Sequence, residues 1–560
     1  MTIAIVIIAL VAGVMLWRYM SKKQQANYTV EDRFGKPPND LEKGNLESIR
    51  KHWALRKKSA MLPHAVDDLT WNDLSMDEVF HRINLCSSSM GEEYLYALLH
   101  EPTMDAAVLQ KRETLLRRLG LTPDLRKKLQ TELLGAGKLD NNGLSAFVHN
   151  IETKGIENIW RYRIQAVVPL VAIGLMFYNV GFGTILLIVS AVVNGWTYMK
   201  KQWKLDVELN AVKYMSAVLR CSKKVAAMKD EAMQPYAEAL REANKAFRPL
   251  TNRFLQITFE SDADWNFIMN YAKLMLMYDF LRFDRVVTVL QRHVAELETI
   301  WNTLGELDAM ISVMSFRQSL QAYCVPQWTE TNTVELTDAW HPLIQSAVRN
   351  SIVLDKNCFV TGSNASGKST FIKAVAINAL LAQTIHTCTA RGYKGPLCRV
   401  LTSMAVKDNV VAGDSYFVAE TKSLKRVIDA AAADDVRCFC FIDEILKGTN
   451  TIERISASAS IANYLLTKNC LCMVATHDIE LPQILGDAFM NVHFSEEITD
   501  DGIRFPYVMH KGVSRTRNAI RLLDFMDFDK TIVSTADTMV QWYEDKRQWK
   551  TLPVREAEHV

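Results

Sequence analysis

The hydrophobic residues of this 560-residue chain follow different patterns in different regions, and each pattern predicts a different structure. In residues 66–150 and 200–320, apolar residues recur at intervals of three and four, which predicts amphipathic helices. Between residues 333 and 483, short apolar runs alternate instead with helical stretches. The runs are residues 351–354, 358–360, 438–442 and 470–475. Such alternation is typical of an α/β domain with a mainly parallel sheet.

The N-terminal stretch is apolar without interruption and predicts a membrane anchor. Residues 2–17 carry no charged side chain, and Arg18, Lys22 and Lys23 follow. A cleaved signal peptide has its basic residues before the apolar run, so we expect an uncleaved anchor over residues 1–23. The basic residues after the anchor predict attachment to the inner or cell membrane, with the remainder of the chain, including residues 333–483, in the cytoplasm.

A second apolar region, residues 164–196, is interrupted at residues 179–183. Its basic flanks are Arg161 and Arg163 on one side and Lys200, Lys201 and Lys204 on the other. Basic residues on both sides predict a hairpin of two transmembrane helices over residues 161–201, entering and leaving by the cytoplasmic face. Each arm is shorter than the ~20 residues of a full span, so a re-entrant hairpin remains open, as does a buried pair of soluble helices.

The composition indicates the general class of protein but not its function. The chain is 49% hydrophobic and 23% charged, which is typical of globular proteins, and its length predicts several domains. Its net charge of +2 gives no overall argument for nucleic acid binding. The pairs Cys438/Cys440 and Cys470/Cys472 lie in apolar runs, so we expect buried free thiols in a reducing compartment rather than metal ligands.

One glycine-rich run has the sequence of a phosphate-binding loop. Residues 362–369 fit the pattern G-x-x-x-x-G-K-S/T, between a strand-like run and a helix-like stretch. Backbone N–H groups of such a loop, and the helix N-terminus after it, attract phosphate. The expected ATP-binding residues are Gly362, Ser363, Asn364, Ala365, Ser366, Gly367, Lys368, Ser369 and Thr370. Lys368 would reach the β and γ phosphates, and Ser369 would hold Mg²⁺.

Two further strand ends supply candidate catalytic residues. The apolar run 438–442 ends in Asp443 and Glu444, an arrangement that would place Asp443 in the Mg²⁺ shell and Glu444 beside the attacking water as a base. The run 470–475 leads to His477. Because ligands bind at the carboxyl edge of parallel sheets, we expect His477 to hydrogen-bond the γ-phosphate.

Together these motifs resemble the ATPase domain of MutS-type DNA mismatch repair proteins. The resemblance rests on residues 361–370, 441–450 and 475–477, on a signature-like loop at 408–420, and on Trp340-His341-Pro342. Upstream, residues 77–95 and Arg112-Glu113 resemble the start of the MutS core domain. In all, the resemblance extends over roughly residues 66–150 and 205–530.

The resemblance implies a homodimer that forms through the ATPase domains. Ser415 would act as a catalytic residue by reaching the partner's γ-phosphate, and Gly448 and Thr449 would lie in the dimer-facing loop. Asn364 would help to hold the phosphates and Mg²⁺. ATP binding would close the dimer, hydrolysis would reopen it, and long helices would carry the motion to a distant substrate site, which in this family is on DNA.

The chain also departs from the family's patterns. Ala365-Ser366 stands where the family usually has Met-Gly. The signature-like loop reads Ala-Gly-Asp-Ser-Tyr-Phe at residues 412–417, where the family usually has Ser-Gly-x-Ser-Thr-Phe. The signature-like loop keeps its glycine, Gly413, and Ser415 is retained, so activity is still expected. We find no N-terminal mismatch-reading domain with its Phe-x-Glu wedge.

The sequence therefore predicts an α/β P-loop ATPase domain of the ABC type, an all-α domain resembling the MutS core, and transmembrane helices. The expected divisions are an anchor at 1–23, a linker at 24–65, a first helical part at 66–160, the hairpin at 161–201, a second helical part at 202–330, the ATPase domain at 331–535 and a tail at 536–560.

We expect a membrane-anchored, ATP-gated dimer that binds DNA, in mismatch repair or a related DNA transaction. The alternative is a nucleotide-gated membrane scaffold that acts on a protein or lipid partner without DNA. A transporter of the ABC type is disfavoured, because the chain has at most three short spans and lacks the Leu-Ser-Gly-Gly signature.

Overall fold

The computed structural model describes most of the chain. The described residues are 31–39, 45–59, 61–139, 151, 155–156, 158–250, 271–363, 366–404, 416–447, 449–499, 502–514 and 519–552. The predicted anchor at 1–23, together with Asn364, Ala365, Ser415 and Gly448, lies outside them. The chain divides into two compact units. The first comprises residues 1–65, 78–101 and 106–321, and the second comprises residues 66–77, 102–105 and 322–560.

The first unit is built from helices. They are α2 (Leu46–Ser59), α5 (Ser89–His100), α6 (Ala106–Leu121), α7 (Pro123–Ala136), α9 (Ile159–Met176), α10 (Val180–Ala226), η3 (Glu231–Met233), α11 (Gln234–Ala246), η4 (Arg248–Leu250), α13 (Tyr278–Arg292) and α14 (Val294–Ser319), with α4 (Met76–Ile83) starting in the second unit. Most of α14 is buried, and it packs against α5, α6 and α11. Gly305 permits the close approach of α5, because a Cβ there would lie 2.8 Å from the carbonyl oxygen of Met90.

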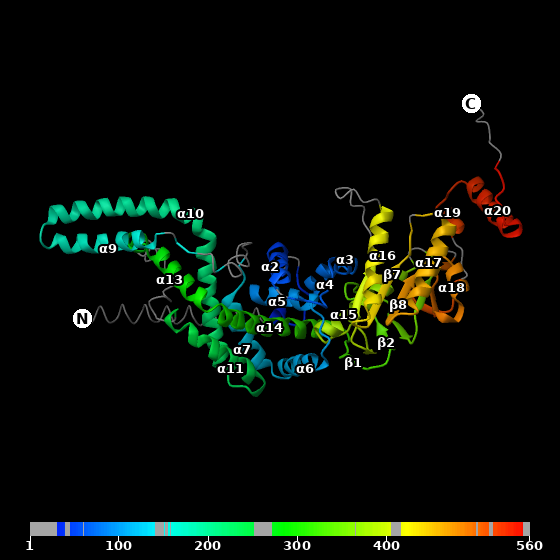
Figure 1. The fold of residues 1–560 in the computed structure, drawn as a ribbon, viewed down its shortest axis with the longest axis horizontal. Helices are drawn as coiled ribbons and strands as arrows, with labels where there is room; N and C mark the ends of the chain where they lie inside the picture. The colour runs from blue at the N-terminus through cyan, green and yellow to red at the C-terminus, as the bar shows by residue number, and fades with distance from the viewer. Residues whose placement is uncertain are drawn as a thin grey trace, which may run out of the picture. The chain divides into compact units, whose positions relative to one another are not determined.

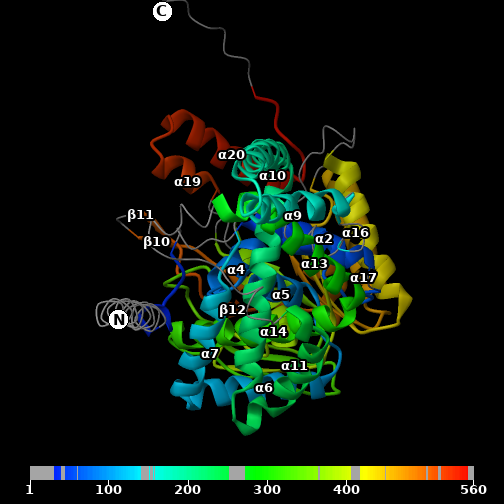
Figure 2. The same cartoon turned by 90° about the vertical axis from the view of Figure 1, so that its left-hand side faces the viewer.

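Helices α9 and α10 form an antiparallel hairpin. Figure 1 shows α9 beside the first part of α10, which then turns away and continues among the other helices of the unit. Figure 2 looks almost along the hairpin. Both arms are apolar and long enough to count as candidate membrane spans, Ile159–Met176 and Val180–Lys201.

The second unit contains the predicted α/β domain, and its main sheet is confirmed as mostly parallel. The six strands lie in the order β12-β9-β4-β8-β7-β6. They are β4 (Cys358–Thr361), β6 (Arg399–Ser403), β7 (Cys438–Asp443), β8 (Cys470–Ala475), β9 (Met490–Phe494) and the antiparallel edge strand β12 (Met509–Lys511). Their central members are buried on both faces, which explains the continuous apolar runs in the sequence.

Smaller sheets and the helices complete this unit. The smaller sheets contain β1 (Gln327–Trp328), β2 (Val334–Ala339), β3 (Asn350–Leu354) and β5 (Gly392–Gly395), and the pair β10 (Glu497–Thr499) and β11 (Gly502–Arg504). The helices are α3 (Asp68–Asp73), α15 (Lys368–Thr384), α16 (Tyr416–Ala433), α17 (Thr451–Leu465), α18 (Glu480–Leu485), η7 (Gly486–Ala488), α19 (Ala519–Phe525) and α20 (Lys530–Lys546). Helix α15 is buried along almost its whole length, and its buried side chains are mostly apolar, with Asn378 and Gln383 among the polar exceptions.

The core of the second unit holds the four cysteines of β7 and β8. All four are buried free thiols, as the sequence predicts. They pack with residues of α16 and α17, such as Val427 and Leu465, on one face of the sheet. This packing fixes β7 and β8 side by side, and both strands end where the candidate site lies.

Candidate nucleotide-binding site

The phosphate-binding motif lies at the carboxyl edge of the main sheet. Strand β4 ends at Thr361, the loop follows, and α15 begins at Lys368. Two glycines adopt backbone angles that other residues avoid, with φ of 138° at Gly362 and 107° at Gly367. A Cβ at Gly362 would also lie 2.4 Å from the carbonyl oxygen of Phe494. The loop therefore needs glycine at Gly362 for both conformation and space.

Lys368 points into this loop. Its Nζ donates hydrogen bonds to the carbonyl oxygens of Gly362 at 2.6 Å and Ser363 at 2.7 Å. Burial lowers the pKa of Lys368, while the carboxylates of Glu444, Asp443 and, less strongly, Glu496 oppose that effect. The ammonium group is thus held inside the loop, where the motif places a phosphate.

Ser369 and Asp443 meet across the sheet edge. Ser369 Oγ, in the first turn of α15, donates a hydrogen bond of 2.7 Å to Asp443 Oδ2 at the end of β7. A hydroxyl and a carboxylate are the oxygen ligands that Mg²⁺ takes beside nucleotide phosphates, so this pair fits that ion. Among the described residues, no group of three or more His, Cys, Asp or Glu side chains could hold a metal ion.

Glu444 and His477 form a second pair beside the first. His477 Nδ1 lies 3.0 Å from Glu444 Oε1, and Lys447 Nζ lies 3.5 Å from the other carboxylate oxygen. The hydrogen bond from His477 is the main reason that the pKa of Glu444 falls to about 2, and the same bond raises the pKa of His477. Glu444 is therefore ionised at neutral pH and can accept a hydrogen bond from a water molecule.

The backbone of Glu444 is strained. Its φ is 61°, in the left-handed region that non-glycine residues rarely adopt. The strained conformation is held by a hydrogen bond of 2.9 Å from its N–H to the carbonyl oxygen of Ala475. Such strain costs of order 1–3 kcal/mol and tends to occur at functional sites.

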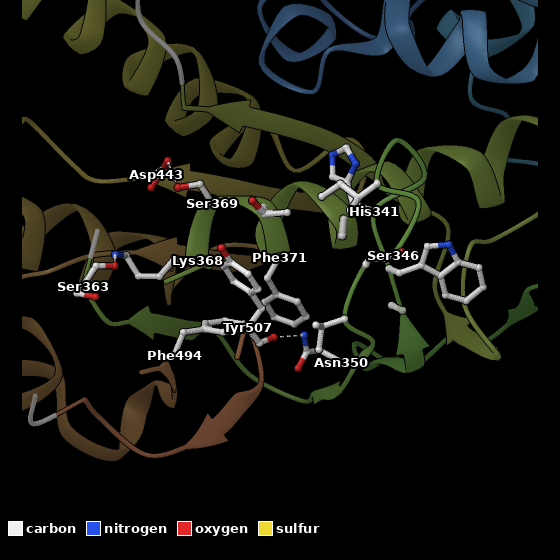
Figure 3. A pocket seen from close by; sticks show the side chains of 18 of the residues that line it. His341, Ser346, Asn350, Ser363, Lys368, Ser369, Phe371, Asp443, Phe494 and Tyr507 are labelled. Atoms are coloured by element: carbon white, nitrogen blue, oxygen red, sulfur yellow. Dashed lines mark hydrogen bonds between the residues drawn. The ribbon is translucent and has the colours of Figure 1, made fainter. Parts of the chain in front are cut away.

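A pocket of about 590 Å³ adjoins the loop. One part is lined by Ser363, Lys368, Ser369 and Asp443, and another by Phe371, Phe494 and Tyr507 (Figure 3). Glu444 and Ile344 also line the pocket. Its volume suits a ligand of nucleotide size. The pocket therefore joins a polar end for phosphate to a largely apolar end for a ring system.

Asn350 fixes one wall of this pocket. Its Nδ2 donates to the carbonyl oxygen of Tyr507 at 3.0 Å, and its Oδ1 accepts from the N–H of Met509 at 2.8 Å. Asn350, Phe494 and Tyr507 were missed by the sequence reasoning, because they come from separate strands and a loop with no motif. Trp340 and His341 also line the pocket, although the sequence analysis used them only as part of a family resemblance.

Most of the sequence-predicted site residues lie together. The described part of the loop and the start of α15 contain Gly362, Ser363 and Ser366 to Thr370. Asp443 lies next to them through its hydrogen bond with Ser369. His477 lies within hydrogen-bond distance of Glu444. Ser366 Oγ closes the loop by donating to the carbonyl oxygen of Ser363 at 2.8 Å.

The matched family comes from a comparison with models of protein families. A family model described as MutS domain V matches residues 358–544. The matched segment starts with the first residue of β4 and contains the loop, β7, β8 and most of α20.

Proposed function

We propose that this chain, a member of the MutS family, is an ATPase that cleaves ATP to ADP and phosphate at the site beside β4. One observation carries the proposal: the contact between Ser369 and Asp443, next to Lys368 inside its glycine loop. In that arrangement the phosphate-binding loop after β4 and the carboxylate at the end of β7, two strands away in the sheet, converge on one point, as phosphoryl transfer requires.

Each side chain has a role in this proposal. Lys368 and the loop N–H groups would bind the phosphates, and Ser369 and Asp443 would hold Mg²⁺, which would supply positive charge to the phosphates. The ionised Glu444 orients and deprotonates the attacking water. His477 Nε2 faces the γ-phosphate, while its Nδ1 holds Glu444 in place. The apolar end of the pocket, at Ile344, Phe371 and Tyr507, receives the base.

We further propose that the chain works as a homodimer on DNA. Family membership supports this step, since MutS proteins usually form dimers and bind DNA. Ser415 would complete the partner's site, and ATP would hold the two ATPase domains together. Closure and opening would then follow from contacts that the triphosphate makes and the diphosphate does not.

Two substitutions test the ATPase proposal. Lys368→Ala should abolish or severely weaken ATP binding, whereas Glu444→Gln should bind ATP but turn it over roughly 10²–10⁴-fold more slowly. Lys425→Ala is the control, because Lys425 is exposed on α16 and pairs with Asp429 in the same helix. Unchanged ATP affinity in Lys368→Ala would refute the phosphate-loop assignment. Normal turnover in Glu444→Gln would remove Glu444 from the role of base.

The α9–α10 hairpin favours a second candidate, a nucleotide-gated scaffold in a membrane. Its outward side chains are apolar, with Phe177 91% exposed and Tyr178 93% exposed. Polar side chains lie between the two helices instead. Asn194 is 1% exposed and donates to the carbonyl oxygen of Gln165 at 2.9 Å, and Gln165 Nε2 donates to Thr197 Oγ1 at 3.1 Å.

This distribution of polar and apolar side chains is the opposite of the one expected for a hairpin in water. A soluble hairpin buries its apolar stripe and exposes its polar residues. Among the described residues, only 22% of each apolar span is buried, which supports the membrane candidate. Arg161, Arg163, Lys200 and Lys201 lie at the base of the hairpin, and residues 164–199 carry no charge. A lipid bilayer with headgroups at the basic end fits both features.

A fluorophore placed at two positions tests the membrane proposal. An environment-sensitive dye on Leu170→Cys, which lies midway along the first arm and is 56% exposed, should shift to the blue when the detergent-purified protein is reconstituted into anionic vesicles. The same dye on Met61→Cys should not shift, because Met61 is 97% exposed outside the hairpin. Equal spectra at both positions would place the hairpin in water.

Salt-dependent binding of the same protein to DNA would favour the DNA function, and its absence would favour the scaffold acting on a lipid or protein partner.

A further inference from the structure

An arginine–aspartate pair lies beside the proposed catalytic histidine. Arg454, in the first turns of α17, donates from Nε to Asp478 Oδ2 at 3.0 Å and from Nη2 to Asp478 Oδ1 at 2.6 Å. Both side chains are largely buried, at 14% and 10% exposure. The backbone of Asp478 is also fixed, because its N–H donates a hydrogen bond to Thr476 Oγ1 at 3.0 Å. This bidentate pair fixes the orientation of the Asp478 carboxylate.

His477 therefore lies between two carboxylates that it contacts unequally. Its Nδ1 is 3.0 Å from Glu444 Oε1, within hydrogen-bond distance. Its Nε2 is 3.7 Å from Asp478 Oδ1, which is too far for a hydrogen bond. Arg454 engages both oxygens of Asp478, so that carboxylate is turned toward α17.

We propose that Arg454 is a positioning residue for the ATPase reaction: by engaging both oxygens of Asp478, it keeps that carboxylate from Nε2 of His477. The inference rests on the proposed function, in which Nε2 faces the γ-phosphate. An imidazole bound by a carboxylate at each nitrogen has no N–H left for phosphate.

The charges around the ring support this role. The groups that act on His477 are Glu444 at the end of β7, Asp478 beside it, and Arg454 from α17, and Lys447 and Lys368 act on Glu444. The two carboxylates raise the pKa of His477, and Arg454 opposes them. Without Arg454, Asp478 would be a largely buried anion without this partner, and a charged imidazolium only 3.7 Å away would attract it.

A double-mutant cycle separates positioning from mere structural support. We expect Arg454→Met to lower kcat by between about 10- and 100-fold with little change in KM for ATP. Asp478→Asn should keep kcat near the level of the unmodified protein, because the neutral amide competes weakly for the ring. The double variant should recover to the level of Asp478→Asn. If the pair only ties α17 to the loop after β8, both single variants and the double variant will be impaired alike, and the proposal fails.

Nuclear magnetic resonance of the nucleotide-free protein gives a readout that does not depend on ATPase activity. With ¹⁵N-labelled histidine, and His477→Gln used to assign the signal, Arg454→Met should shift the Nε2 resonance of His477. The double variant should restore it. An unshifted resonance overturns the proposal, whereas a shifted and restored resonance in a protein without ATPase activity overturns only the proposed function.

A second variant covers the case in which Arg454→Met does not fold. Arg454→Lys retains the charge but lacks the planar fork, so it leaves one Asp478 oxygen free. It should show an intermediate kcat and an intermediate Nε2 shift. Full activity together with the unmodified Nε2 resonance in Arg454→Lys would contradict a role for bidentate contact.

Discussion

At the residue scale, Gly362 shows how one missing Cβ atom permits the phosphate loop. Gly362 and Gly486 both have positive φ, 138° and 54°, but only Gly362 faces another backbone at close range. Gly362→Ala should therefore abolish detectable ATP binding, because either the loop or the strand end at Phe494 must move. Gly486→Ala, where nothing lies within 4 Å of the added atom, should cost stability without changing ATP affinity. Nucleotide titration of both variants is the measurement, and equal affinities would contradict the steric argument.

A buried ion pair in the first unit gives a second prediction at this scale. Arg317 Nη2 lies 2.6 Å from Glu113 Oε2, and both side chains are 2% exposed. Glu113→Ala removes the carboxylate from a buried guanidinium, which should lower the free energy of unfolding by about 3–5 kcal/mol. Glu47→Ala removes an exposed partner of Lys51, and should cost only about 0–1 kcal/mol. Urea denaturation of the two variants provides the comparison, and similar losses would show that Glu113 is not holding a buried charge.

At the scale of elements, the sequence predicts structure wherever the information is local. The phosphate loop, β7 and β8 follow from a motif and two continuous apolar runs, and all three lie where expected. The run 351–354 is also a strand, but β3 pairs with β2 in an antiparallel arrangement within a different sheet. An apolar run predicts a strand but not the strand with which it pairs. The position of β3 in the smaller sheet could therefore not be predicted from the sequence.

The pocket wall shows the same limit. Tyr507 and Asn350 are 157 positions apart in sequence, and their contact depends on the folding of the whole unit. The end of helix α10 was also not predictable from local sequence. The helix continues from the second arm of the hairpin to Ala226 without a break. The charged segment after the hairpin contains good helix formers, so a change in polarity does not end the helix there.

Helix α5 gives a prediction at this scale through its contact with α14. Asp308 of α14 accepts hydrogen bonds from the N–H groups of Ser87 and Ser88 and from Ser88 Oγ, at the start of α5. Burial raises the pKa of Asp308 to about 6. Because the folded state binds this proton more tightly, its stabilising effect is complete below about pH 4 and is lost as pH rises through 6.

The expected loss is up to about 1.4 kcal/mol per pH unit across that window. Asp308→Asn cannot titrate, so this component of the pH dependence should disappear. The measurement is the urea midpoint of both proteins from pH 4 to pH 7, compared as a difference, because other groups titrate equally in each. Parallel curves for the two proteins would show that Asp308 has an ordinary pKa in the fold.

At the scale of the whole molecule, one chain combines a nucleotide site with an apolar helical hairpin. The two features belong to different units, and each has its own local origin. The nucleotide site depends on strand ends of the main sheet, whereas the hairpin depends on two apolar helices with polar contacts between them. The proposed function requires the site to act across a dimer, and that requirement can be tested directly.

Mixed dimers test whether each site needs the partner. Lys368→Ala and Ser415→Ala should each inactivate the homodimer, the first by losing phosphate contact and the second by withholding Ser415 from the partner's site. When the two variants are combined, one site has Lys368 and receives Ser415 from the other protomer, so each mixed dimer should regain one working site of two. The measurement is ATP turnover on mixing, with a pair of Lys368→Ala and Glu444→Gln as the control. In that control no site recovers, because Glu444 acts within its own protomer. Failure of the first pair to recover, although mixed dimers form, would show that Ser415 does not act across the dimer.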